Sequence, residues 1–254
     1  MFRLCSLIMM TVSTIVTMTT AMMFSSLSFG APNIPSIYWR TSPLSPPFSS
    51  RNDVLSLVPP GFQQQRQQRI LVEFDLFVDL LCSDSAAWWT SVFSQLDSYY
   101  FSNATSSAPI RFNLYLLPLP YHTASYLGSM TYVGVNRYTN YDQRVLKQIV
   151  NSFFTNQTPL YNNIVNAMTQ PQIMNLIYSN NIKSLNIIPQ QAYLKLMNDP
   201  SIDMRTRTLF KLSTATGVFA TPSFYVNKVP VQNGEDFSVQ DWISYFNQIL
   251  SSSY

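Results

Sequence analysis

The stretch from Ile70 to Tyr100 constrains the fold more than any other part of the sequence. In its first half, apolar residues alternate with a second set that includes Glu73 and Asp75, a period of two that is typical of a β-strand. The apolar positions are Ile70, Val72, Phe74, Leu76 and Val78. In its second half, apolar residues recur at helical spacing, at Trp89, Val92, Phe93, Leu96 and Tyr100. The stretch therefore predicts a strand that leads directly into a helix.

Cys82 lies at the junction between this strand and this helix. It is followed by Ser83, Asp84 and Ser85, which are residue types that cap helix N-termini. A helix N-terminus carries a positive partial charge and free N–H groups, and both favour a thiolate over a thiol. We therefore expect Cys82 to be accessible and reactive. The alternative is a buried and inert cysteine, because free Cys is among the most buried residue types.

The only other cysteine, Cys5, lies in an N-terminal segment with the layout of a secretory signal. Arg3 supplies the positive charge, residues 4–24 are mostly apolar, and we expect cleavage after Gly30 or Ala31. The mature chain would then keep one thiol, which excludes an intramolecular disulfide framework. An uncleaved anchor is the alternative, and only that would give a stable membrane association. In both cases the rest of the chain is expected in the endoplasmic reticulum lumen or outside the cell.

The sequons at Asn103 and Asn156 agree with that compartment and predict glycosylation. The net charge of +3 is scattered and forms no basic run, which argues against a nucleic-acid partner. The aromatic content of 14% argues against disorder.

The remaining elements follow in order along the chain. A Pro- and Ser-rich leader carries one short edge strand at Val54–Val58, and Ile110–Leu117 is a second buried strand. A helical region follows, with predicted helices at Thr123–Val135, Tyr141–Phe154, Leu160–Met168, Gln172–Tyr178, Pro189–Met197 and Met204–Thr216. The chain ends with a hairpin of Ser223–Val226 and Val229–Val231 and then a helix with a capping box at Ser238 and Asp241.

These elements divide the chain into five parts. We predict a signal peptide at 1–30, a leader at 31–58, a first α/β half at 59–120, a helical insertion at 121–216 and a second α/β half at 217–254. The predicted order is βαβ, helical insertion, ββα.

Three blocks of the sequence resemble a known family. They are DLFVDLLCSDS from Asp75, LLPLPYH from Leu116 and GVFATPSFYVN from Gly217. Together with the order of the elements, they resemble the DSBA-like thioredoxin-domain proteins of the eukaryotic secretory pathway. The resemblance covers about Pro59 to Leu250. It implies an α/β, thioredoxin-like fold with an inserted all-helical subdomain, as in DsbA.

The resemblance also implies roles for individual residues. Cys82 takes the place of the attacking thiol, and Pro222 takes the place of a cis-proline beside it. Thr221 would present its backbone to a bound peptide, and Asp75 would be a buried acid under the active site. Ser85 stands where redox-active members have a second cysteine, so it could only hydrogen-bond the neighbouring sulfur. His122 is expected to be a surface or hydrogen-bonding residue rather than a catalyst.

Three functions remain open from the sequence. The first is monothiol thiol–disulfide exchange by Cys82, as an isomerase or a glutathione-linked reductase acting on cysteine-containing clients. The second is a non-catalytic module that binds extended peptides beside Pro222. The third is a glutathione-dependent transferase or isomerase. No cofactor or metal motif is present in the sequence, and glutathione enters only as a co-substrate.

Overall fold

The computed structural model describes residues 53–63 and 69–252. Within them, five strands form one mixed sheet in the order β1-β3-β2-β4-β5. The strands are β1 (Leu55–Leu57), β2 (Val72–Val78), β3 (Ile110–Leu116), β4 (Ser223–Val226) and β5 (Val229–Val231). Strand β2 is parallel to β3 and antiparallel to β4, and β1 is antiparallel to β3. The predicted edge strand, the two buried strands and the hairpin are therefore confirmed.

The strand β2 lies at the centre of the sheet and is buried on both faces. Its last residue, Val78, pairs with Leu116 at the end of β3, and Phe77 pairs with Ser223 at the start of β4. This register places the residues that follow β2 next to the residues that precede β4. Cys82 and Pro222 therefore meet at the same edge of the sheet.

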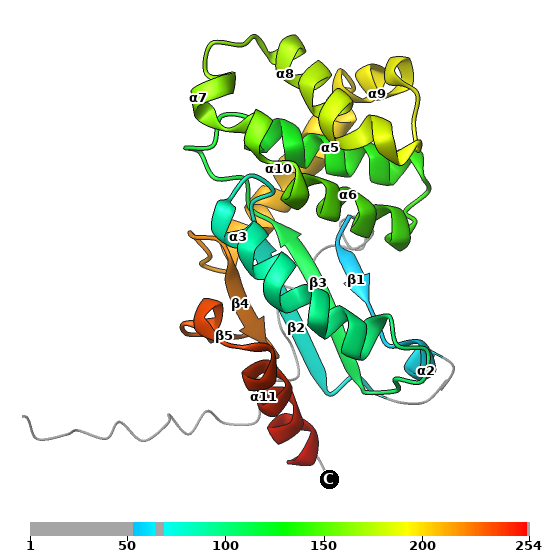
Figure 1. The fold of residues 1–254 in the computed structure, drawn as a ribbon, viewed down its shortest axis with the longest axis vertical. Coiled ribbons are helices and arrows are strands. Elements are labelled where there is room, and N and C mark those ends of the chain that lie inside the picture. The colour runs from blue at the N-terminus through cyan, green and yellow to red at the C-terminus, as the bar shows by residue number, and fades with distance from the viewer. Residues whose placement is uncertain (1–52, 64–68, 253–254) are drawn as a thin grey trace, which may run out of the picture. The chain divides into compact units, whose positions relative to one another are not determined.

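A long helical run follows β2 and covers one face of the sheet (Figure 1). It consists of α3 (Ser83–Trp88), η2 (Trp89–Phe93), α4 (Ser94–Leu96) and η3 (Asp97–Phe101), of which η2 and η3 are π-helical turns. The C-terminal helix α11 (Val239–Ser251) packs beside it on the same face. Between them lies an aromatic cluster in which the ring of Phe74 is 4.7 Å from that of Trp242, and the ring of Trp88 is 4.9 Å from that of Phe224. Burial of several aromatic side chains in one place is a major source of core stability.

The helical region lies between β3 and β4 in the chain, as predicted. Its elements are α5 (Ser125–Tyr138), α6 (Gln143–Thr155), η4 (Thr158–Leu160), α7 (Asn162–Val165), α8 (Gln170–Ile177), η5 (Tyr178–Ile182), η6 (Lys183–Leu185), α9 (Gln190–Met197) and α10 (Pro200–Ala215). The predicted helix at Leu160–Met168 is wrong in extent, since only the short η4 and α7 form there. The extended backbone of Tyr161, with ψ of 151°, separates these two elements.

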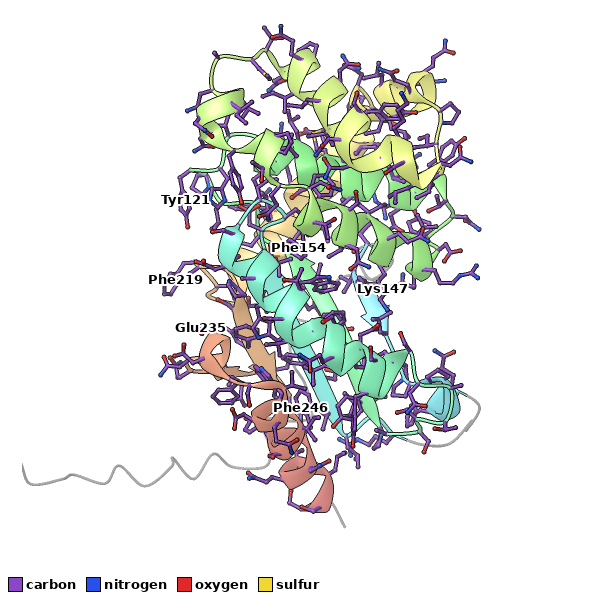
Figure 2. All side chains as sticks on the ribbon, in the orientation of Figure 1. Tyr121, Lys147, Phe154, Phe219, Glu235 and Phe246 are labelled. Atoms are coloured by element: carbon purple, nitrogen blue, oxygen red, sulfur yellow. The ribbon has the colours of Figure 1, made fainter. Side chains whose placement is uncertain are left out.

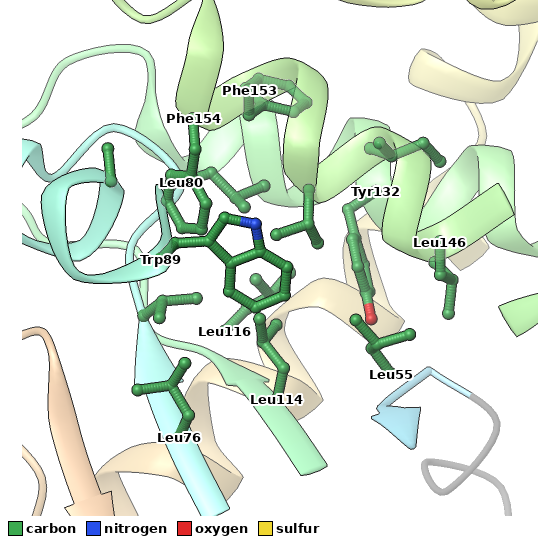
Figure 3. Close-up of a cluster of buried hydrophobic side chains, with 14 of the residues drawn as sticks. Leu55, Leu76, Leu80, Trp89, Leu114, Leu116, Tyr132, Leu146, Phe153 and Phe154 are labelled. Carbon is green, nitrogen blue, oxygen red and sulfur yellow. The ribbon is translucent and has the colours of Figure 1, made fainter. Parts of the chain in front are cut away.

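The insertion shares a hydrophobic core with the sheet (Figure 3). Trp89 lies among Leu114 of β3 and Phe154 of α6, and its indole Nε1 donates a hydrogen bond of 2.7 Å to Asn151 Oδ1. On the other face of the sheet, a smaller core contains Phe77 and Tyr115, whose rings stack at 4.9 Å. Helix α10 closes that face, and Ser213 Oγ donates to Leu116 O at 2.8 Å.

The turn between β4 and β5 matches the tight turn expected there. Asn227 and Lys228 have φ of 51° and 68°, and Asn tolerates this left-handed region better than most residues. The Asn227 side chain also bonds the start of β2, since it accepts from Glu73 N at 2.7 Å and donates to Leu71 O at 3.0 Å. The predicted signal peptide and most of the predicted leader lie outside the described residues.

Candidate active site

Cys82 lies at the start of α3, as predicted, but it is itself the N-cap residue, and the expected capping residues Ser83, Asp84 and Ser85 lie inside the helix. The backbone turns after β2 through Asp79 to Leu81, and Cys82 N donates to Asp79 O at 3.1 Å. The side chain does not cap the helix. Instead, it points to the loop before β4, where Cys82 Sγ donates to Thr221 O at 3.2 Å.

The loop before β4 brings the carbonyl of Thr221, the residue before Pro222, against the thiol. The peptide bond between these two residues is cis, in agreement with the sequence-based expectation. Among the described residues Cys82 is the one free cysteine, and only 6% of its surface is exposed. The expectation that Cys82 is accessible is therefore wrong. The physical reason is tertiary, because Thr221 covers the sulfur from a part of the chain 139 residues away.

Ser85 lies one helical turn after Cys82 and is 0% exposed. Its hydroxyl has no hydrogen-bond partner, so the expected bond from Ser85 to the neighbouring sulfur is absent. The sulfur's partner is the Thr221 carbonyl instead. The hydroxyl of Thr221 is also buried without a partner. Asp84 is exposed, and its carboxylate accepts a 3.5 Å contact from Ser83 Oγ.

Asp75 is buried, as predicted, but it does not bond the thiol. It is 2% exposed and lies in the middle of β2, opposite Tyr225. Its carboxylate accepts from Asn113 Nδ2 at 2.8 Å and from Lys228 Nζ at 2.6 Å. The Cys82 sulfur instead bonds the Thr221 carbonyl, so no hydrogen bond joins Asp75 to the thiol.

Burial and charge act in opposite directions on this ion pair. Burial raises the pKa of Asp75, although the ammonium group of Lys228 opposes the shift. Burial also works to lower the pKa of Lys228, but the charges of Asp75 and Glu73 together raise it. Because Lys228 lies in the β4–β5 turn and Asp75 lies in the central strand β2, this ion pair joins the turn to the centre of the sheet.

A second buried carboxylate, Asp79, organises the loop that carries Cys82. It is 0% exposed and accepts from Leu81 N at 2.9 Å and from Leu119 N at 3.0 Å. The ring Nδ1 of His122 lies 2.7 Å from Asp79 Oδ2, and the hydroxyl of Ser125 also bonds this carboxylate. Asp79 thus connects the Cys82 loop to the segment that begins the insertion. The expectation that His122 is a hydrogen-bonding residue is confirmed.

Gln157 fixes the same loop from the insertion. Its Nε2 donates to Leu80 O at 2.9 Å and to Cys82 O at 3.0 Å. Its Oε1 accepts from the Tyr161 hydroxyl at 3.2 Å. Asp79 and Gln157 were both missed by sequence reasoning. Nothing in the sequence near Gln157, 75 residues from Cys82, indicates this contact.

Exposed apolar side chains lie in, or a few residues from, the segments that contact the Cys82 loop. We call them the apolar rim: Phe219 (89% exposed), Tyr121 (60%), Ile164 (39%) and Tyr161 (36%). Phe219 lies two residues before Thr221, and Tyr121 precedes His122. Figure 2 shows Tyr121 and Phe219 projecting on the same side of the molecule, near the start of α3. Large exposed apolar side chains grouped in this way are typical of a binding surface.

Both sequons are on the surface. Asn103 and Asn156 are exposed, and Asn103 Oδ1 accepts from Thr105 Oγ1 at 2.8 Å. Over residues 53–63 and 69–252, no group of three or more His, Cys, Asp or Glu side chains is placed to bind a metal ion. Within the same residues, every helix is too short or too polar to cross a membrane.

Comparison with solved structures identifies the fold. The chain aligns with α-DsbA1 of Wolbachia pipientis at a TM-score of 0.56 and 14% identity, covering 83% of this chain and 96% of that one. It aligns with oxidised BdbD of Bacillus subtilis at a TM-score of 0.54 and 13% identity, covering 77% and 97%. For reduced DsbA of Mycobacterium tuberculosis the TM-score is 0.54 and the identity 11%, with 78% and 92% covered.

The chain has a DsbA-like thioredoxin fold. The mixed sheet and the helical insertion between β3 and β4 confirm the predicted fold class. At identities of 11–14%, these similarities concern the fold, and function has to be argued from the site. No protein-family model matches the sequence, and no curated protein does.

Proposed function

We propose that this protein carries out monothiol thiol–disulfide exchange on cysteine-containing proteins of the secretory pathway. The observation that carries this proposal is the contact of 3.2 Å between Cys82 Sγ and the Thr221 carbonyl, at the start of the helical run after β2. Cys82 lies at a helix start, and Thr221 and Pro222 offer backbone to an extended client segment.

In the proposed reaction, the Cys82 thiolate attacks one sulfur of a client disulfide. A sulfur–sulfur bond forms to Cys82 while the client bond breaks, and the released client sulfur leaves as a thiolate. A client thiolate or glutathione then attacks the client sulfur of the mixed disulfide and releases Cys82. Ser85 has no thiol and does not take part, so the cycle rearranges or reduces disulfides with an external thiol.

The burial of Cys82 makes client binding part of the reaction. Because only 6% of the residue is exposed and the Thr221 carbonyl contacts the sulfur, the client must displace the loop before β4. The apolar rim provides the surface for this step, and Phe219 is its most exposed member. We also propose that the protein is processed as a secretory protein, with cleavage near Ala31 and glycosylation at Asn103 or Asn156. The proposed boundaries between its five parts are at residues 30, 58, 120 and 216.

A second candidate function is a peptide-binding module without catalysis. The observation that favours it is again the burial of Cys82, together with the lack of a second cysteine among the described residues. In this case, peptides would bind the apolar rim and the sulfur would contribute little.

Reactivation of a protein with scrambled disulfides, in glutathione buffer, tests the proposal. The wild type should accelerate reactivation, and Cys82→Ser should be inactive although it is folded, as judged by circular dichroism. Peptide affinity is measured on the same samples. Inactive wild-type protein with peptide affinity unchanged in Cys82→Ser would overturn the exchange proposal and leave the binding module.

A further inference from the structure

Ion pairs are distributed unevenly over the acidic residues of this chain. All 12 Asp and Glu residues lie in the part that the structure describes. Most of them form an ion pair with Lys, Arg or His, namely Asp53, Glu73, Asp75, Asp79, Asp97, Asp142, Asp199 and Asp203. Asp241 bonds Ser238 in the capping box of α11. The others, Asp84, Glu235 and Asp236, are exposed and have no cationic partner among the described residues.

These unpaired acids lie on the face of the sheet that α3 covers. Asp84 is in the first turn of α3, the helix that begins after the thiol. The other two belong to the short 3-10 helix η7 (Gly234–Asp236). Both helices pack on Phe224 of β4, since the Trp88 ring of α3 lies 4.9 Å from its ring and a Cβ on Gly234 would lie 2.7 Å from its Cδ2. The acids therefore flank the strand that follows the cis-proline.

The apolar rim lies beside these acids. Figure 2 shows Phe219 and Glu235 projecting on the same side of the molecule. Tyr121 and Tyr161 are held close together, because Asn162, the residue after Tyr161, donates from Nδ2 to Tyr121 O at 2.6 Å. Large apolar side chains and unpaired carboxylates thus share one side of the protein.

Lys and Arg are missing from the segments that form this side. They do not occur in residues 70–110, 112–136, 148–182 or 212–227. The cation closest to Phe219 along the chain is Lys211, on α10, which closes the opposite face of the sheet. The only histidine, His122, faces the buried carboxylate of Asp79. The exposed acids beside the rim therefore keep their negative charge without a cation nearby in the chain.

We propose that the client segments of this protein carry Lys or Arg next to the apolar residues that occupy the rim. This inference rests on the proposed function and names its substrate class, an extended segment that is both basic and apolar around its cysteine. Apolar client side chains cover Phe219 and Tyr121, and client cations approach Asp84 and Glu235. Complementary charges across an interface favour the right partner and repel partners of like charge, so acidic segments are excluded.

Binding of three synthetic peptides tests the proposal. The peptides share leucines beside a central serine, which replaces the cysteine, and differ only in flanking residues that are Lys, Gln or Glu. At about 0.02 M salt the Lys peptide should bind about tenfold more tightly than the Gln peptide, since each exposed ion pair contributes about twofold or somewhat more. At about 0.5 M salt the preference should fall to roughly twofold, because the charges are screened.

Substitution of the acids locates the effect. The triple variant Asp84→Asn, Glu235→Gln and Asp236→Asn should lose the preference for the Lys peptide while its affinity for the Gln peptide stays at the wild-type value. The matched control is Asp142→Asn, which also removes a negative charge. Asp142 caps the start of α6, at the far end of that helix from Gln157, and Asn is an equally good cap. This control should keep the full preference.

Four results would overturn the proposal: no binding of any peptide, equal affinity for the Lys and Gln peptides at low salt, tightest binding of the Glu peptide, or an unchanged preference in the triple variant. Exchange is measured separately, with the same peptides carrying a central cysteine in a disulfide with glutathione. If exchange proceeds equally fast with Lys and Gln peptides, the charge preference is wrong and the proposed function stands. If the Lys peptide binds preferentially but no exchange occurs, the exchange proposal fails and the charge preference holds for a binding module.

Discussion

Replacement of Gln157 should loosen the loop that carries Cys82. The Gln157 amide donates to the carbonyls of Leu80 and Cys82 at 2.9 and 3.0 Å, inside the protein. The side chain is 5% exposed, so water cannot replace these bonds without entering the core. With about 1–2 kcal/mol for each bond, Gln157→Leu should lower the free energy of unfolding by about 2–4 kcal/mol. Leucine keeps most of the volume, so the loss reports the hydrogen bonds rather than a cavity.

Thermal unfolding and alkylation together measure this effect. For a domain of this size, 1 kcal/mol shifts the midpoint by about 2–4 °C, so Gln157→Leu should lower it by roughly 4–16 °C. Iodoacetamide should also react with Cys82 faster than in the wild type. The matched control is Gln95→Ala, whose exposed amide donates to Ser91 O within the helix at 2.7 Å. If Gln157→Leu behaved like Gln95→Ala in both measurements, the insertion would not fix the Cys82 loop.

Three further predictions concern the rim, the core and the buried ion pair. Phe219→Ser should leave thermal stability unchanged, because the side chain is 89% exposed, but should weaken peptide binding by about 1.5–3 kcal/mol in calorimetry. A large fall in thermal stability together with an unchanged peptide affinity would contradict the proposal that the apolar rim binds peptides. Gly234→Ala should cost about 1–3 kcal/mol in thermal unfolding, because a Cβ there would lie 2.7 Å from Phe224 Cδ2, and a wild-type midpoint would contradict this contact. Burial raises the pKa of Asp75 above 3.8, so its contribution to stability is present below that value and is lost as pH rises through the folded-state pKa. Urea unfolding between about pH 4 and pH 7 should therefore show Asp75→Asn gaining stability relative to the wild type as pH rises, and the opposite slope would refute the burial argument.

Periodicity was sufficient to predict the sheet and most helices. The alternation from Ile70 to Val78 matches β2, and the apolar spacing after Ser83 matches the run that ends at Phe101. Local patterns succeed here because each strand and helix buries a regular set of positions. They failed at Leu160–Met168, where the apolar residues are shared between two short elements and the extended backbone of Tyr161.

The site was predicted only where its residues follow one another in the chain. Cys82 at a helix start and a cis bond before Pro222 could be predicted from short motifs. The burial of the sulfur could not, because it depends on how the loop before β4 and the insertion pack against α3. The roles of Asp79 and Gln157 depend on the same packing. Asp75 was placed under the thiol, but its partners, Asn113 and Lys228, come from other strands and turns.

The state of Cys82 after incubation with a disulfide-containing peptide tests the exchange proposal most directly. The native protein should form one mixed disulfide, mapped to Cys82 by mass spectrometry and stable until a thiol is added, because Ser85 cannot resolve it. Cys82→Ser should form none, and Ser85→Cys should shorten the lifetime of the adduct. If the folded protein formed no adduct while the urea-unfolded protein reacted at Cys82, the thiol would be an inert core residue and the exchange proposal would be wrong.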